Sequence, residues 1–402
     1  MSFLSAAERF AAIDRSEIVL NSQQCLHSLD QFSTCDSCLG ICPVDAIQSG
    51  KPPIFDANSC QNCFACLPAC PTGAYSADDA VQSLLTCATR FETKTTELLC
   101  ALHEDSDIGI QSESTAVQIR GCLAGLGVGT YLALGALGLE KIILRLDACD
   151  NCPWASLQKI IQSQVDQANQ LLAHWGKSEM LVCVLEPDTR SVPRPLWRAD
   201  NPPLSRRDLF RMAARQGQVA IARMMSMHDH SKKHSLGRDR LRLINAIKHF
   251  PSSEDVIDTS LDESKFNLLS VSEKCDACMA CARACPTQAL TYELKGDKTF
   301  FSLLFNPQLC VGCELCIHVC APNAIELNQA LTFTQVFSYV DARKVFESEI
   351  IPCAKCNALF APKSGQKLCS LCEFRKKNPF GSKTPNLRPT DAPVGRQKPN
   401  AS

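Results

Sequence analysis

The spacing of the cysteines restricts the fold of this chain more than any other feature. The sequence holds 26 cysteines in 402 residues, gathered in four blocks. The strictest pattern, four cysteines separated by two, two and three residues, occurs twice in the C-terminal half: Cys275, Cys278, Cys281 and Cys285, then Cys310, Cys313, Cys316 and Cys320. Three thiolates on one tight loop suit three iron corners of a [4Fe–4S] cubane, and the fourth reaches a neighbouring cubane.

The two runs are therefore expected to exchange their fourth ligands. One predicted cluster takes Cys275, Cys278, Cys281 and Cys320, and the other takes Cys310, Cys313, Cys316 and Cys285. Zinc is the other metal that grouped cysteines commonly bind. The repeated two-two-three spacing favours iron–sulfur clusters.

The N-terminal block repeats this scheme with one gap. Its complete run is Cys60, Cys63, Cys66 and Cys70, and its first run has only Cys35, Cys38 and Cys42. The missing leading cysteine falls at Phe32, and Cys25 lies upstream as the natural substitute. We predict one cluster on Cys25, Cys35, Cys38 and Cys70 and a second on Cys60, Cys63, Cys66 and Cys42. The alternative is a three-ligand cluster with Cys25 merely buried.

Segments 25–75 and 265–330 resemble bacterial-type dicluster ferredoxin domains, down to the motifs CPVDAI, CPTGAY and CPTQAL that follow the runs. They form an internal repeat. The resemblance implies four [4Fe–4S] clusters in two pairs, which shuttle single electrons.

Between these blocks the sequence alternates between strand-like and helix-like segments. The expected strands are 97–102, 116–122, 141–146 and 180–185, and the expected helices are 125–138 and 155–175. Such alternation predicts an α/β domain with a parallel sheet. Cys122, Cys149 and Cys152 follow two of the strands, so they should meet at the carboxyl edge of the sheet, where Cys87 and Cys100 could join them.

Segment 119–153 is similar to the small iron–sulfur delta subunit of methanogen-type hydrogenase and heterodisulfide reductase assemblies. It shares an arginine-containing strand that ends in a cysteine, then a helix and a strand that leads to paired cysteines. The similarity covers roughly 80–186. It implies a fifth centre, [2Fe–2S] or [4Fe–4S], on Cys122, Cys149 and Cys152 with Cys87 or Cys100. Cys183, inside an apolar strand, is expected in the core.

The glycines 125, 127 and 129 allow two interpretations. A glycine-rich turn between a strand and a helix can cradle a phosphate, but Thr130 stands where the dinucleotide motif needs its third glycine. Close packing around a metal loop is the favoured explanation.

The surrounding stretch 121–139 has no charged residue and approaches the length of a membrane span. Its six glycines and the apolar segment that follows favour a buried strand, turn and helix.

The last block, Cys353, Cys356, Cys369 and Cys372, has the spacing of a zinc ribbon. Two short knuckles each supply two thiolates to a closed tetrahedral site. Zinc is favoured, although a rubredoxin-like iron would use the same four sulfurs.

The net charge and the signal-like motifs of the sequence limit which partners and which cellular location are expected. The chain carries 41 Lys and Arg against 42 Asp and Glu, which argues against nucleic acid or an anionic membrane as a bulk partner. Charged residues near the N-terminus leave no room for the apolar core of a secretory signal. The motif SRRDLF at 205–210 resembles a twin-arginine signal but lies far inside the chain. A cytoplasmic location follows, where reduced cysteines serve as metal ligands rather than disulfides.

The expected architecture is a multidomain chain of α+β and α/β class, with two ferredoxin-like dicluster modules flanking a parallel-sheet domain and a C-terminal zinc-ribbon-like knuckle. The predicted divisions are 1–78, dicluster module; 79–190, α/β iron–sulfur domain; 191–262, proline-rich break and basic, solvated helical linker that opens a helix at Ser205; 263–345, second dicluster module; 346–376, zinc module; and 377–402, disordered tail.

No catalytic constellation is recognisable, so the predicted function is electron relay between a redox enzyme or flavoprotein subunit and another carrier. One alternative is an enzyme subunit coupled to a flavoprotein. The other is a regulatory or assembly protein that binds a partner through its zinc ribbon and basic linker. No membrane span is expected, so any membrane association would be peripheral, through partners.

Overall fold

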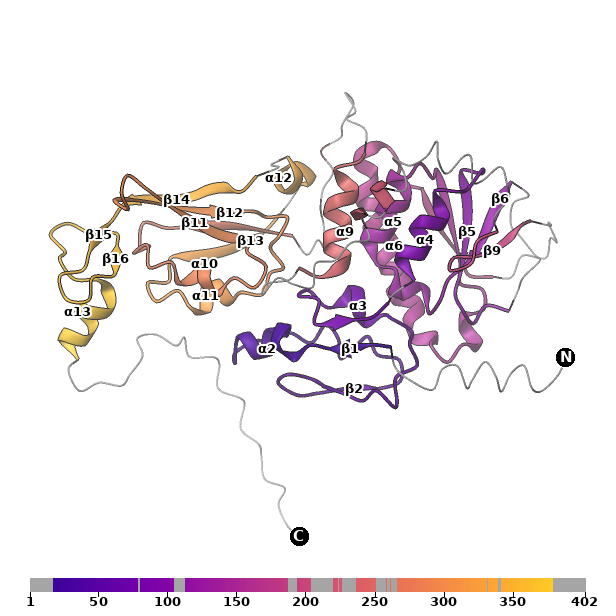
Figure 1. Cartoon of the computed structure of the whole chain (residues 1–402), viewed down its shortest axis with the longest axis horizontal. Coiled ribbons are helices and arrows are strands. Elements are labelled where there is room, and N and C mark those ends of the chain that lie inside the picture. Colours follow the sequence, from indigo (N-terminus) through magenta and orange to yellow (C-terminus); the bar gives the residue numbers. More distant parts are fainter. Residues whose placement is uncertain are drawn as a thin grey trace, which may run out of the picture.

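The computed structural model describes residues 17–78, 80–104, 113–186, 194–203, 220–222, 224–225, 236–250, 258, 261, 266–330, 332–338 and 341–378. The helix expected at Ser205, the SRRDLF motif and nearly all of the C-terminal tail lie outside these residues. The described chain forms four parts: an N-terminal cysteine module (17–78), a sheet domain (80–203, with a later helix), a C-terminal cysteine module (266–349) and a terminal knuckle (351–378). In Figure 1 the N-terminal module lies below the sheet domain, and the C-terminal module and the knuckle extend to the left.

A five-stranded parallel sheet forms the core of the sheet domain. In the order β8-β7-β5-β6-β9, its strands are Leu181–Val184, Lys141–Arg145, Thr95–Leu99, Ser114–Gln118 and Leu196–Arg198. Strands β5, β6 and β7 are buried along almost their whole length, as expected for parallel strands covered on both faces. Four strands were expected from the sequence. The fifth, β9, comes from the segment interpreted as a proline-rich break.

Helices α4 (Val81–Ala88), α5 (Val128–Ala136) and α6 (Gln158–Leu172) pack beside the sheet, and α9 (Arg238–Ile247) packs on α5 (Figure 1). Helix α6 buries Ile161, Val165, Ala168 and Leu172 at helical spacing. Helix α9 lies in the segment expected to be a solvated linker, yet it buries Leu243, Ile244 and Ala246 against the domain. That expectation was wrong, because the charged side chains of α9 contact other parts of the protein.

The glycines 127 and 129 allow α9 to approach α5 closely. A Cβ atom on Gly129 would lie 2.2 Å from the Asp239 carbonyl oxygen, and one on Gly127 would lie 2.4 Å from the Asp239 carboxylate. The backbone N–H of Gly129 donates to that carboxylate at 2.8 Å. Asp239 thus occupies the place where a phosphate would bind at the start of α5. The glycine-rich turn before α5 therefore serves the packing of α9 on α5.

No described helix is long and apolar enough to cross a membrane. The uncharged stretch folds instead into a short 3₁₀ turn, Leu123–Gly125, and the nine residues of α5.

The N-terminal cysteine module is built from two short antiparallel pairs. Strand β1 (Val19–Leu20) pairs with β4 (Tyr75–Ser76), and β2 (Ile47–Gln48) pairs with β3 (Ile54–Phe55). Its helices are α2 (Leu26–Leu29) and α3 (Cys66–Ala69). The module packs below the sheet domain (Figure 1), where Gly121 and Gly125 leave space for Phe64 and the backbone of Cys63.

The C-terminal cysteine module has a similar pairing and an added sheet. Strand β10 (Asn267–Val271) pairs with β13 (Ile325–Gln329) as β1 pairs with β4. Helices α10 (Ala280–Ala284) and α11 (Leu315–His318) lie within the two cysteine runs. The added antiparallel sheet consists of β11 (Leu290–Lys295), β12 (Phe300–Phe305) and β14 (Arg343–Glu349). Helix α12 (Phe333–Phe337) begins with a capping box at Thr332.

Aromatic rings join this module to the sheet domain. Phe333 of α12 stacks on His174 with ring centroids 3.8 Å apart, and it meets Trp175 edge-on at 5.2 Å. The terminal knuckle follows, with β15 (Ile351–Pro352), β16 (Leu359–Phe360) and α13 (Ser370–Lys377) at the far end of the molecule (Figure 1).

Candidate metal centres

Four thiols of the N-terminal cysteine module line one cavity: Cys25, Cys35, Cys38 and Cys70. Cys25 reaches it from the turn just before α2. Burial raises the pKa of the Cys25 thiol, and the neighbouring thiols of Cys70 and Cys35 add to that rise. The structure thus brings together the four cysteines predicted for one cluster. We call this group the first thiol set.

The second thiol set consists of Cys42, Cys60, Cys63 and Cys66. Burial raises the pKa of Cys63 to about 11, and the thiols of Cys42 and Cys60 act in the same direction. The pKa of Cys66 is raised well above its usual value, again by burial first and then by Cys63, Cys60 and Cys42. Thiols with a raised pKa are protonated at neutral pH, and a metal that binds them would displace those protons.

The C-terminal cysteine module contains two more sets in the predicted crossed arrangement. Cys275 interacts electrostatically with Cys320, and Cys281 interacts with both. Cys278, whose thiol interacts electrostatically with that of Cys281, completes the third thiol set. The fourth set is Cys285, Cys310, Cys313 and Cys316, in which burial and then the other three thiols raise the pKa of Cys316.

The two cysteine modules repeat each other at the level of single hydrogen bonds. The N–H of Ala74 donates to Cys70 Sγ at 3.2 Å, and the N–H of Ala324 donates to Cys320 Sγ at the same distance. Each alanine lies four residues after the last cysteine of its run, in CPTGAY (70–75) and CAPNAI (320–325). An N–H donor to sulfur stabilises the thiolate and tunes the metal that it binds.

A fifth thiol set lies at the carboxyl edge of the parallel sheet. Cys100 follows β5, Cys122 follows β6, and Cys149 and Cys152 lie in the loop after β7. Burial and then Cys100 and Cys152 raise the pKa of Cys149 to about 12, and Cys100 and Cys149 also act on Cys122. Of the two candidates for the fourth position, the structure brings Cys100 to this set.

The remaining cysteines of the sheet domain lie elsewhere. Cys87 is completely buried within α4, and Arg90 is its charged neighbour. Cys183 lies on the edge strand β8 and lines a surface groove with Asp166, so it is less buried than the core position expected for it.

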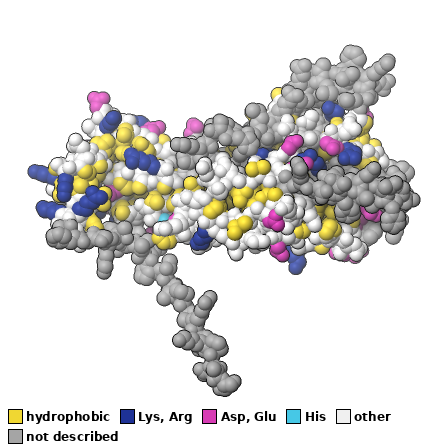
Figure 2. Space-filling view, turned by 60° about the horizontal axis from the view of Figure 1, so that its bottom comes forward, with side chains coloured by type: hydrophobic (Ala, Val, Ile, Leu, Met, Phe, Trp, Pro, Cys, Tyr) yellow, Lys and Arg dark blue, Asp and Glu magenta, His cyan; other side chains and the backbone are white. Residues whose placement is uncertain are grey.

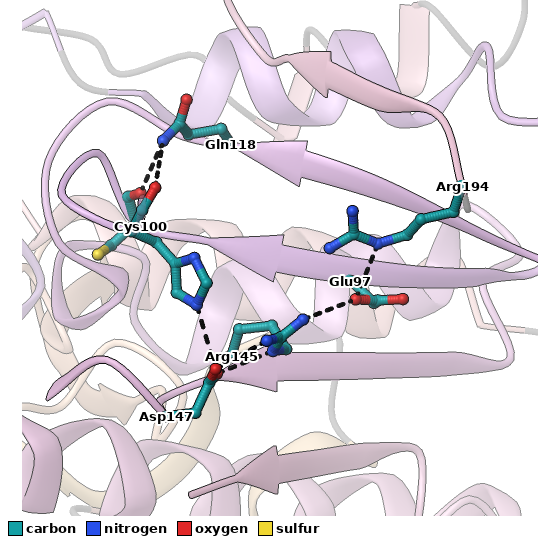
Figure 3. Close-up of polar contacts among 7 residues, drawn as sticks. Glu97, Cys100, Gln118, Arg145, Asp147 and Arg194 are labelled. Atoms are coloured by element: carbon teal, nitrogen blue, oxygen red, sulfur yellow. Dashed lines mark hydrogen bonds and ion pairs between the residues drawn. The ribbon is translucent and has the colours of Figure 1, made fainter. Parts of the chain in front are cut away.

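A buried network of charged groups supports the loops of the fifth set (Figure 3). Arg145 donates to Asp147 at 2.8 Å and 2.7 Å and to Glu97 at 3.4 Å, and Arg194 pairs with Glu97 at 3.0 Å. His103 lies 3.3 Å from Asp147. Burial alone would raise the pKa of Asp147, but hydrogen bonds from His103 and Arg145 hold it well below its usual range.

Gln118 connects this network to the cysteine loop. Its side-chain amide donates to the carbonyl oxygens of Cys100, at 3.3 Å, and His103, at 3.1 Å (Figure 3). Sequence reasoning missed these residues. The available signal was a glutamate and an arginine inside otherwise apolar strands, which is costly unless they pair.

The thiols of the terminal knuckle are closer together than those of the other sets. The ligand atoms of Cys353, Cys356, Cys369 and Cys372 all lie within 4.8 Å of one another. Cys356 Sγ and Cys369 Sγ are 3.7 Å apart. Tetrahedral zinc with Zn–S bonds of about 2.3 Å requires sulfurs about 3.8 Å apart. The N–H of Cys369 donates to Cys353 Sγ and lowers the pKa of Cys353 to about 6.

Neighbouring sets are in contact along the molecule. The N–H of Cys122, in the fifth set, donates to the carbonyl of Cys63, in the second set, at 3.2 Å. His318 Nδ1, beside the fourth set, lies 2.6 Å from Asp30 Oδ2, beside the first. Cys281 of the third set acts on Cys316 of the fourth.

Comparison with known families matches residues 274–324 to the 4Fe-4S dicluster domain. No curated protein matches the chain. The matched segment holds both cysteine runs of the C-terminal module, so this part of the protein is a ferredoxin-type 4Fe–4S module.

Proposed function

We propose that this protein is a multicentre iron–sulfur relay that passes single electrons between a redox enzyme or flavoprotein and another carrier. The observation that carries the proposal is the series of thiol sets, fifth, second, first, fourth and third. Contacts link the fifth set to the second, the first to the fourth and the fourth to the third, and the second and first share one module. A bound iron–sulfur cluster supplies a one-electron couple. The protein's part is to hold such groups close together, shielded from water, and to donate N–H groups to their sulfurs.

The first four thiol sets each fit a [4Fe–4S] cluster. Each has four thiols, three from one region of the chain and one from the partner run, which is the arrangement of two-cluster ferredoxins. The N-terminal module is proposed as a second copy of the matched domain, because its pairing of β1 with β4 and its Ala74–Cys70 bond repeat those of the C-terminal module.

The fifth set fits a [2Fe–2S] or [4Fe–4S] centre. Its four thiols come from three loops at one sheet edge, as in the delta-subunit type of domain that the sequence resembles. Cys100, Cys122, Cys149 and Cys152 are the proposed ligands.

The terminal knuckle fits structural zinc, because its sulfur spacing is that of a closed tetrahedral site. The knuckle packs on the loop of the third set. Asp276 of that loop accepts hydrogen bonds from the N–H of Ala361, at 2.8 Å, and from the hydroxyl of Ser370. We propose that the knuckle braces this loop and carries no electrons.

Anaerobic purification followed by iron, sulfide and zinc quantitation and reductive EPR tests the proposal. Protein with four cubanes holds about sixteen irons, and two to four more if the fifth set is filled. A stable preparation with fewer than about twelve irons, or with clusters that no donor reduces reversibly, would refute the relay. Replacing Cys353 and Cys356 with alanine should release one zinc and leave the clusters reducible. Loss of a red, rubredoxin-like absorption instead would show iron in the knuckle.

Partner binding through the knuckle is the second candidate function, and the surface charge favours it. Figure 2 shows basic side chains gathered at this end of the molecule. The exposed cations of 351–378 are Lys355, Lys363, Lys367, Arg375, Lys376 and Lys377, against one acidic residue, Glu373. Lys376→Glu should slow reduction by an acidic flavodoxin but not by dithionite, and Lys159→Glu, an exposed change on α6, should slow neither. Equal rates with flavodoxin in all three proteins would exclude this role.

A further inference from the structure

The start of α9 touches every large part of the protein through four consecutive residues. The N–H of Gly237 donates to Pro71 beside the first thiol set, and Arg238 donates to the carbonyl of Ala77. Asp239 accepts from Gly129 of the sheet domain. Arg240 extends in the other direction, into the C-terminal cysteine module. This short segment therefore lies at the junction between the two cysteine modules.

Arg240 is held in one position against the loop of the fourth set. Its Nε donates to the carbonyl of Gln308 at 2.9 Å, and its Nη2 donates to the carbonyl of Cys310 at 3.1 Å. Its guanidinium lies 3.7 Å from the centroid of the Phe266 ring. Arg240 is half-buried and, as an arginine, remains charged at neutral pH. A positive charge fixed against the ligand loop acts on a neighbouring metal centre.

The third and fifth sets have carboxylates among their charged neighbours. Asp276 lies within electrostatic range of Cys275 and Cys278. At the fifth set, Asp147 and Asp150 act on Cys149, and Asp147 is itself paired with Arg145. The charges of Asp276 and Asp150 oppose the negative charge that an added electron brings.

The fourth set also has a carboxylate nearby, Asp30, which acts on Cys313. That carboxylate accepts hydrogen bonds from the N–H of Phe32, at 2.9 Å, and lies 2.6 Å from His318. The N–H of Phe32 and the ring of His318 offset part of the negative charge of Asp30. The guanidinium of Arg240 touches the ligand loop directly, so the net bias at this set favours added negative charge.

We propose that Arg240 makes the centre on Cys285, Cys310, Cys313 and Cys316 the one that is reduced first, so that electrons entering from either end of the relay come to rest at the junction of the two modules. This inference rests on the proposed relay function. The step is the gain of one electron at this centre and the loss of one by its donor, with no transfer of a proton or an atom. Arg240 acts through charge and position, and it binds no iron.

A potentiometric titration with dithionite, followed by EPR on the full-length anaerobic protein, tests the proposal. The signal of the fourth set is identified by its change in Cys313→Ser. In the unaltered protein, this signal should appear first as the potential is lowered. Arg240→Gln should move it to a lower potential and change the order of reduction, and Arg240→Lys should keep the order. Arg343→Gln is the matched control, because Arg343 is in the same module and also lies over a ring, Phe305, at 5.9 Å.

Each result either supports or overturns the proposal that Arg240 makes the fourth set the first to be reduced. If another signal appears first in the unaltered protein, or if Arg240→Gln retains its iron and the original order, the assignment is wrong. If Arg240→Gln loses iron, the order in which the EPR signals appear in the unaltered protein and in Arg240→Lys still tests the assignment. The signal of the fourth set must appear first in both. A protein whose centres are not reducible at all would instead overturn the relay function, so the two failures are distinguishable.

Discussion

The position of a cysteine relative to the end of its strand or helix decides whether it can hold a metal in this protein. Cys100 is one residue beyond β5, at the sheet edge where the loops of Cys122 and Cys149 also lie. Cys87 is inside α4, where the helix fixes its thiol in an apolar interior. Both cysteines are close in sequence to the same strand, so only the three-dimensional arrangement separates them.

Alanine substitutions at these two positions give a matched pair. Cys100→Ala should remove the fifth centre, lowering the iron content by two to four atoms per chain and removing one EPR signal. Cys87→Ala should leave iron content unchanged and cost at most about 1–2 kcal/mol of stability from the lost burial. Iron quantitation beside EPR is the measurement. Loss of iron in Cys87→Ala alone would reverse the assignment.

The buried ion pairs beside the fifth set should make the stability of the protein depend on pH. Because the pKa of Asp147 is lower in the folded protein than in the unfolded chain, its contribution to stability is present above the unfolded value of about 3.9 and is lost as pH falls through that value towards the folded pKa. Asp147→Asn should therefore destabilise the protein by about 3 kcal/mol at pH 7, and by less at pH 4.

Urea unfolding at both pH values measures this difference. Asp150→Asn, in the same loop but exposed, is the control, because it shares any acid-induced loss of iron. A destabilisation by Asp147→Asn that is the same at pH 4 and pH 7 would show that the carboxylate charge is not what the network stabilises.

At the scale of elements, the sequence predicted those features that depend on local pattern. The thiols of Cys275, Cys278, Cys281 and Cys320 meet as their spacing implied, and four strands of the sheet lie within a few residues of their expected bounds. Helix α9 could not be placed, because Arg238, Arg240 and Arg242 make it look solvated. Their partners, such as the carbonyl oxygens of Ala77 and Cys310, are distant in sequence and carry no recognisable pattern.

The contact between α5 and α9 depends on the absence of a side chain at Gly129. Gly129→Ala would place a Cβ atom 2.2 Å from a backbone oxygen, so the two helices must separate. We expect a loss of about 1–3 kcal/mol and weaker protection of α9 in hydrogen exchange. Gly40→Ala, where the new Cβ atom meets nothing within 4 Å, is the control. Unchanged exchange of α9 in Gly129→Ala would show that α9 is held mainly by its polar contacts.

At the scale of the whole molecule, the fixed contacts between parts matter more than any single centre. Trp154 of the sheet domain donates to Gln61 of the N-terminal module at 2.9 Å, and His318 of the C-terminal module meets Asp30. Both contacts lie beside thiol sets. An electron relay needs such fixed distances, and a set of independent domains on flexible linkers would not provide them.

The direct contact between a residue of the fifth set and a residue of the second set predicts a magnetic interaction between their centres. Because the N–H of Cys122 bonds to the carbonyl of Cys63, centres on the fifth and second sets would be neighbours across a single hydrogen bond. When both are reduced, their unpaired spins should couple and broaden or split both EPR signals. Cys122→Ser should remove the fifth centre and return the second to a simple signal, with the other clusters retained. Cys278→Ser, at the far end of the series, should leave the splitting intact. Unsplit signals from a fully loaded, fully reduced protein would mean that these two sets do not form adjacent steps of one relay.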